Sequence, residues 1–63
     1  MSSNFYRYDI VTEKGSVGFY IDAEKAQQGF KQYCKDKDDG YNKKVMLYGI
    51  ERGSRKQTLL AQY

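Results

Sequence analysis

Few residues of this chain could perform chemistry. Histidine is absent, so the one cysteine, Cys34, lacks the base that usually activates a thiol nucleophile. Cys34 also lies next to an apolar stripe of helical spacing, which favours a structural role. The eight carboxylates are scattered, and Asp22 is more simply explained as a helix cap. The sequence therefore predicts no catalytic residue and a protein that is not an enzyme.

A short acidic segment that ends at Gly40 has some likeness to a calcium-binding loop, but its spacing is wrong. With Gly40 in the sixth position, the first and third positions are lysines, Lys35 and Lys37. With Asp36 in the first position, the twelfth is Leu47 and not glutamate. One cysteine without histidine leaves no zinc site, and the dispersed glycines form no phosphate-binding loop. We therefore expect no metal and no cofactor.

The pattern of apolar residues predicts a small α+β domain that covers residues 1–63, with residues 1–4 flexible. It predicts strands over 5–13, 17–21, 45–50 and 57–63, and a helix of about four turns that begins at residue 23. Asp22 is a suitable N-cap for the helix, and Gly40 is suited to end it. The order β-β-α-β-β indicates a four-stranded, mainly antiparallel sheet with one helix packed on one face.

Strict alternation along the strands predicts which side chains face the helix. The inward set is Tyr6, Tyr8, Ile10, Val17, Phe19 and Ile21. Phe5 and Tyr20 are expected to face outward, and the strand over 45–50 has apolar residues on both faces. In the last strand, Leu59 and Ala61 share one face and Leu60 takes the other. Because one helix covers one side of a sheet, the other side is a candidate surface for a dimer or for a partner.

The tyrosines and the basic residues support two functional hypotheses. Seven tyrosines are many for 63 residues. They can be half-buried at the rim of a small sheet, or they can form an interface, in which tyrosine is enriched. A domain this small, without a disulfide or a metal, often relies on a partner or on a second copy for stability. The first hypothesis is therefore a macromolecule-binding protein whose partner is another protein or, in a homodimer, a second copy of the chain. The residues expected to bind are Phe5, Tyr20, Tyr48, Arg52 and Arg55.

The alternative hypothesis is direct nucleic-acid binding. The chain carries a net charge of +3, with eight of its eleven basic residues after residue 30 and tyrosines interleaved among them. Basic residues can follow phosphates while aromatic rings stack on bases. The residues expected to do this are Lys43, Lys44, Arg52, Arg55 and Lys56. Lysines that flank strands also protect sheet edges from aggregation, which needs no ligand.

In size and general character the chain resembles the very short, single-domain accessory proteins of bacteriophages. This resemblance implies a viral protein that binds and inhibits or modulates a host protein or a defence complex. No apolar run approaches the roughly 20 residues of a membrane span, and residues 1–5 do not form a secretory signal. The expected location is therefore the cytoplasm, which would be that of the host if the protein is viral.

Overall fold

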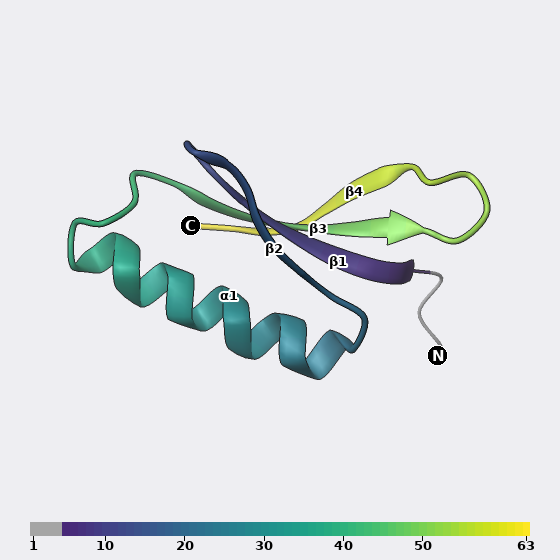
Figure 1. Ribbon diagram of the computed structural model, residues 1–63, viewed down its shortest axis with the longest axis horizontal. Coiled ribbons are helices and arrows are strands. Elements are labelled where there is room, and N and C mark those ends of the chain that lie inside the picture. Colours follow the sequence, from purple (N-terminus) through teal and green to yellow (C-terminus); the bar gives the residue numbers. More distant parts are fainter. Residues whose placement is uncertain (1–4) are drawn as a thin grey trace.

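A computed structural model describes residues 5–63 of the protein; the expectation for residues 1–4 lies outside this range. The elements are β1 (Phe5–Thr12), β2 (Gly15–Tyr20), α1 (Ala23–Asp38), β3 (Val45–Glu51) and β4 (Gln57–Gln62). The strands form one antiparallel sheet in the order β2-β1-β3-β4, and α1 lies along one side of it (Figure 1). The predicted α+β class and its β-β-α-β-β order are confirmed.

Both ends of α1 follow from residues that the sequence singles out. At the start, the Asp22 carboxylate accepts a hydrogen bond from the amide of Glu24 at 2.8 Å. At the end, Gly40 takes a φ of +92°, a conformation that costs glycine little. The amides of Gly40 and Tyr41 then donate to the carbonyls of Lys37 and Asp36, a pairing typical of helix C-termini. The chain therefore turns sharply toward β3.

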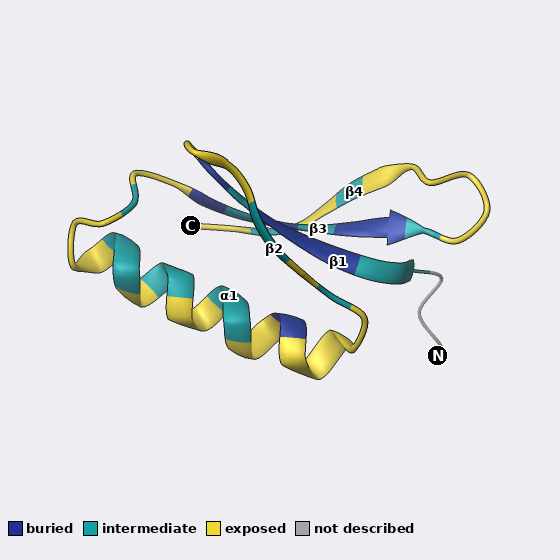
Figure 2. Cartoon of the chain, in the orientation of Figure 1, coloured by how far each residue is buried: buried dark blue, intermediate teal, exposed yellow. Residues whose placement is uncertain are grey.

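The hydrophobic core lies between α1 and the two central strands. Its buried members on this side are Tyr8, Ile10, Ala26, Val45 and Leu47, and Ile10 and Val45 have no exposed surface. Phe5, Val17, Tyr20, Phe30, Tyr33 and Ala61 pack around them. Figure 2 shows the buried residues along β1 and β3, while most of the outer side of α1 is exposed. The two central strands and one helix face thus supply nearly all of the core.

Three β-bulges interrupt the alternation of side chains, one in each of β1, β2 and β4. The extra residues are Tyr6, Val17 and Leu60, each of which lies between two paired residues of its own strand. A bulge inserts one residue into one strand only, so the side chains beyond it exchange faces. This is why part of the predicted face is wrong in each of these three strands, although Tyr8, Ile10 and Val17 face the core as predicted.

In β1 the bulge turns Phe5 toward the helix. Phe5 pairs with Glu51, and its ring lies over Gly49 and meets the ring of Tyr8 edge-on, with centroids 5.9 Å apart. Tyr6 is displaced from the core and lines a cleft at the β3–β4 hairpin instead. The predicted outward position of Phe5 is therefore wrong.

In β2 the bulge reverses the positions expected for Phe19 and Tyr20. Val17 packs against the core as predicted, but Gly18 now pairs with Ile10, and Tyr20 pairs with Tyr8. Tyr20 consequently lies against the helix, where a Cβ added at Gly29 would come within 2.6 Å of its ring. Phe19 faces outward and is 62% exposed.

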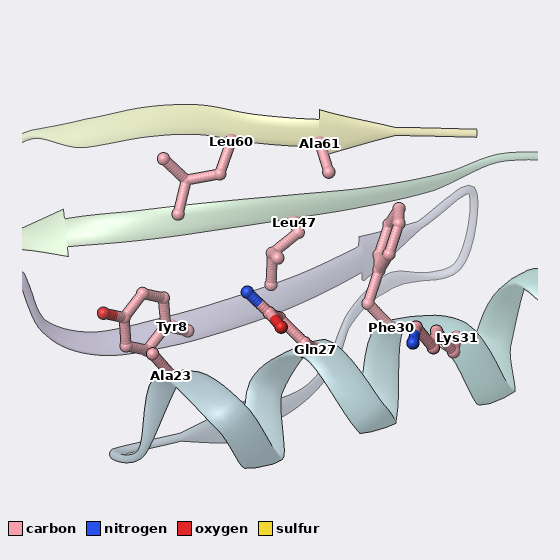
Figure 3. A pocket seen from close by; sticks show the side chains of 8 residues that line it. All are labelled: Tyr8, Ala23, Gln27, Phe30, Lys31, Leu47, Leu60 and Ala61. Atoms are coloured by element: carbon pink, nitrogen blue, oxygen red, sulfur yellow. The ribbon is translucent and has the colours of Figure 1, made fainter.

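The helix contacts β1, β2 and β3 but does not reach β4. Between α1 and β4 a groove of about 240 Å³ remains, into which Leu60 and Phe30 point from opposite sides (Figure 3). Leu60 can lie beside Ala61 on this side because it is the extra residue of the β4 bulge. Leu59, expected to share a face with Ala61, instead pairs with Tyr48 on the other side of the sheet.

Among residues 5–63, no helix has the length and apolar character that crossing a lipid bilayer requires.

The contact between Phe5 and Gly49 predicts the effect of a substitution. In Gly49→Ala, the new Cβ would lie 2.8 Å from ring carbons of Phe5, so we expect a loss of about 1–3 kcal/mol in the free energy of unfolding. Chemical denaturation measures it. Gly18→Ala is the matched control, because its Cβ would find its nearest neighbour at 3.9 Å. In a Phe5→Ala background the cost at Gly49 should largely vanish; an unchanged cost would contradict this explanation.

Candidate binding surfaces

Within residues 5–63, no element packs on the side of the sheet opposite α1. We call this side the uncovered face, and its charged, aromatic and apolar residues are Arg7, Asp9, Val11, Phe19, Met46, Tyr48, Ile50 and Leu59. Ile50 is buried on this side and is not part of the core cluster beneath the helix. The strands therefore carry apolar residues on both faces, as the sequence predicts for β3.

One row of side chains crosses the uncovered face over all four strands. In register, Phe19 lies beside Asp9, Asp9 beside Tyr48, and Tyr48 beside Leu59. The two outer members are exposed by 62% for Phe19 and 48% for Leu59, while Tyr48 is half-buried. Large apolar side chains are therefore exposed at both ends of this row.

The Arg7 guanidinium connects the polar and aromatic parts of this row. Its Nη2 donates to Oδ2 of Asp9 at 3.2 Å, and its Nε lies 3.1 Å from Oδ1. The second pair lacks hydrogen-bond geometry and therefore contributes charge attraction alone. Arg7 also lies over the ring of Phe19, with Cζ 5.5 Å from the centroid. The carboxylate of Asp9, only 6% exposed, is thus neutralised inside an apolar surface.

Tyr48 is held in place on the same face. Its hydroxyl donates to the sulfur of Met46 at 3.5 Å, two residues along β3. Both side chains are half-buried, so each keeps part of its surface available. The centre of the uncovered face is therefore fixed by contacts within the face itself.

The basic residues expected to bind nucleic acid lie at opposite ends of β3. Lys43 and Lys44 precede it, and Arg52, Arg55 and Lys56 follow it in the hairpin to β4. Seven residues of strand separate the two groups by about 23 Å. The structure brings the three hairpin residues together but does not join them to the two lysines in one patch.

Glu13 positions the end that carries the two lysines. Its Oε1 accepts hydrogen bonds from the backbone amides of Lys43 at 2.9 Å and Lys44 at 3.4 Å. The bond from the Lys43 amide, above all, holds the pKa of Glu13 below its ordinary value. Lys14 supports the same contact region by donating from Nζ to the carbonyl of Tyr41 at 3.3 Å. The β1–β2 turn and the segment before β3 are therefore tied together.

The hairpin between β3 and β4 extends beyond the end of the helix and is exposed throughout (Figures 1 and 2). Tyr6, Arg52, Gly53 and Arg55 line a shallow cleft of about 320 Å³ there. Sequence reasoning placed Tyr6 in the core, because nothing in the strand pattern marks the bulge. The lining of this cleft therefore includes two arginines and a tyrosine.

Of the five residues expected to bind a partner, three keep an outward position and two do not. Tyr48, Arg52 and Arg55 lie on the uncovered face or in the hairpin. Phe5 and Tyr20 face the helix, each over a glycine, so their outward orientation is corrected. The residues that sequence reasoning missed are Phe19 and Leu59. Only Gly18 indicates in the sequence that Phe19 faces outward, because a glycine inside a strand can mark a bulge.

Most tyrosines are used in packing. Tyr8 is buried, Tyr6, Tyr20, Tyr33 and Tyr48 are half-buried, and only Tyr41 and Tyr63 are exposed. Tyr33 donates from its hydroxyl to the carbonyl of Val17 at 3.4 Å, and Tyr63 donates to Asp38 at 2.6 Å. The abundance of tyrosine is therefore explained largely by the half-buried rim of a thin domain.

Cys34 is half-buried in α1, where burial and the carboxylate of Asp38 raise the pKa of its thiol. A higher pKa lowers the fraction of the nucleophilic thiolate at neutral pH. Within residues 5–63, no cluster of three or more metal-ligating side chains occurs.

Comparison with protein-family models, with curated proteins and with solved structures finds no match to this chain. Its function therefore has to be argued from its own surfaces.

The Glu13 contact predicts a pH-dependent stability. Because the pKa of Glu13 is lowered on folding, its carboxylate stabilises the protein above the unfolded value of 4.5, and this contribution is lost as the pH falls through the lowered pKa. Glu13→Gln should therefore melt at a lower temperature than the wild type at pH 7. The difference should shrink toward zero in melting curves recorded at progressively lower pH.

Lys43→Gln is the control for this prediction, since it removes the side-chain charge but keeps the backbone amide that donates to Glu13. We expect it to leave the pH dependence intact. A Glu13→Gln difference that stays constant down to pH 2 would rule out the carboxylate as its source.

Proposed function

We propose that this protein is a non-enzymatic binding module that docks on another protein through its uncovered face. The observation that carries the proposal is the row from Phe19 to Leu59, whose two ends expose large apolar side chains on a sheet face that no helix covers. Exposed apolar surface bordered by polar groups is typical of protein interaction sites. The contacts among Arg7, Asp9 and Phe19 pre-form this surface before any partner arrives.

The charges at the ends of the face support a partner with acidic groups around an apolar patch. The end before β3 carries three lysines (Lys14, Lys43 and Lys44) and one carboxylate, Glu13. The end after β3 carries three basic residues and one carboxylate, Glu51. Both ends therefore carry a net charge of about +2, while the ion pair in the centre is neutral. Carboxylates of a partner would meet complementary charge at either end, which favours fast and selective association.

The same charges speak against a second copy of the chain as the occupant. If two copies packed face to face, each basic end would meet a basic end of its partner, whether the strands ran in the same or in opposite directions. Like charges across an interface oppose association. The homodimer that the sequence suggests is therefore not the occupant we propose for this face.

Nucleic acid is also a poorer fit than an acidic protein. A phosphate chain needs a basic track, but here the two basic groups lie about 23 Å apart with the Asp9 carboxylate between them. One side of the Phe19 ring, the most exposed aromatic ring on the face, is already occupied by Arg7. The resemblance to bacteriophage accessory proteins suggests that the partner is a host protein or a defence complex that this chain inhibits or modulates.

The test is a comparison of two double variants. Phe19→Ser with Leu59→Gln removes both exposed ends of the row, whereas Tyr41→Ser with Leu60→Gln removes similar exposed apolar groups elsewhere. Proteins captured from a host lysate by each tagged form are quantified by mass spectrometry. We expect a partner that the wild type and the second variant retain and that the first variant loses at least tenfold, because two apolar anchors contribute about 1–2 kcal/mol each.

Three outcomes would contradict the proposal. One is a partner bound equally well by both double variants, which would place its site elsewhere. Another is a pure protein that sediments as a dimer, with the Phe19 and Leu59 variant reverting to a monomer. The third is binding of short oligonucleotides by the wild type but not by this variant, which would make nucleic acid the ligand of the face.

A further inference from the structure

The hairpin between β3 and β4 is held in one conformation by its own hydrogen bonds. Across its base, the amide of Glu51 donates to the carbonyl of Lys56 at 2.8 Å, and the amide of Arg55 donates to the carbonyl of Glu51 at 3.0 Å. The hydroxyl of Ser54 donates to Oε1 of Glu51 at 3.1 Å and accepts from the amide of Lys56 at 3.3 Å. This exposed loop is therefore ordered before anything binds to it.

Arg55 adopts a backbone conformation that is unfavourable for its residue type. Its φ is +59°, and it is the one residue with a side chain among residues 5–63 that has a positive φ. Glycine, or at some cost asparagine, would normally occupy this position. A strained residue kept in an otherwise well-bonded loop points to a role for its side chain.

Arg55 lies in the same hollow of the surface as Arg52. Both line the cleft of about 320 Å³, together with Tyr6 and Gly53. Within residues 5–63, neither guanidinium has an ion pair or a side-chain hydrogen bond, and the nearby Glu51 carboxylate accepts from Ser54. Two positive charges thus share one hollow, and among residues 5–63 neither forms an ion pair with the nearby Glu51 carboxylate or with any other.

From this geometry we propose that the hairpin cleft binds a phosphate monoester, with Arg52 and Arg55 as the charged donors and the Tyr6 hydroxyl as a third donor. A phosphate monoester carries close to two negative charges at neutral pH and presents three acceptor oxygens. Two guanidinium groups match this charge and can each donate in pairs to its oxygens. A carboxylate offers one charge and two oxygens, so it matches the cleft less well.

This inference deepens the proposed function. It rests on that function only in taking the phosphate to come from the partner protein. Arg7 pairs with Ile50, the residue next to the start of the hairpin, so the cleft adjoins the uncovered face. A protein docked on that face would therefore reach the cleft with a phosphorylated side chain. Binding of a free phosphate monoester needs no partner, which makes the two proposals separable.

The experiment is an NMR titration of the ¹⁵N-labelled protein with O-phosphoserine, with serine and glutamate as matched probes. We expect phosphoserine alone to shift the amide signals of residues 52–56, with weaker binding at pH 5 than at pH 7.5 because the phosphate loses a charge near pH 6. Arg55→Gln should weaken binding at least fivefold. Lys43→Gln removes the same charge at the opposite end of β3 and should leave the dissociation constant unchanged.

Arg55→Gly provides a second variant that separates binding from folding. Glycine adopts the backbone conformation of residue 55 without strain, so this variant should melt at a higher temperature than the wild type and yet lose phosphoserine binding. Equal weakening by Arg55→Gln and Lys43→Gln would overturn the site in favour of general charge attraction. Absence of shifts in the hairpin, or equal shifts with glutamate, would also overturn it.

The source of the phosphate is resolved by two further ligands. A phosphoserine peptide that binds more tightly than a 5′-phosphorylated oligonucleotide supports a protein partner. Tighter binding of the oligonucleotide would contradict a protein partner as the source of the phosphate. The variant with Phe19→Ser and Leu59→Gln should bind free phosphoserine like the wild type, so a failed docking surface and a failed cleft give different results.

Discussion

A single helix has to cover a four-stranded sheet, and most features of this protein follow from that constraint. The 16 residues of α1 form a rod about 24 Å long and about 10 Å wide. Four strands span about 14 Å between their outer axes, and their second face needs cover as well. The helix therefore contacts three strands on one side, leaving a groove beside β4 and the opposite face of the sheet without cover.

Two close contacts each combine an aromatic ring with a glycine. One lies between α1 and β2, and the other lies between β3 and the start of β1. Tyr20 occupies the space that a side chain at Gly29 would need, and Phe5 does the same at Gly49. The rings thereby fill the edges of a core whose fully buried side chains are few. Gly29 is unfavourable for an isolated helix by about 1 kcal/mol relative to alanine, and this cost is the consequence of the fit.

The sequence allowed the elements of this fold to be predicted well because their signals are local. The cap at Asp22, the stop at Gly40 and the alternation in β3 depend on neighbouring residues, and each is found where expected. The faces of β1, β2 and β4 could not be predicted in the same way. A bulge depends on how two strands pair, and one extra residue exchanges Phe19 with Tyr20 without any change in composition.

The same distinction applies to the candidate surfaces. Arg52 and Arg55 could be singled out because a polar hairpin tip is visible in the sequence, whereas the contribution of Tyr6 depends on the bulge in β1. Strict alternation predicts the wrong face for Phe19 and the wrong neighbour for Leu59, the two exposed large apolar residues of the uncovered face. The register in which the strands pair therefore determines the surface that we propose for binding, while the local pattern of residue types determines the scaffold that carries it.

The central claim is that the face opposite α1 is open in the isolated protein and ready to receive a partner. It is tested most directly by solvent paramagnetic relaxation in NMR, with a neutral gadolinium chelate added to the pure protein. The account predicts strong relaxation of the Phe19 ring and the Leu59 methyl groups, and protection of Ile10 and Leu47 beneath the helix. Protection of Phe19 and Leu59 to the same degree as Leu47 would contradict it, since the face would then already be covered.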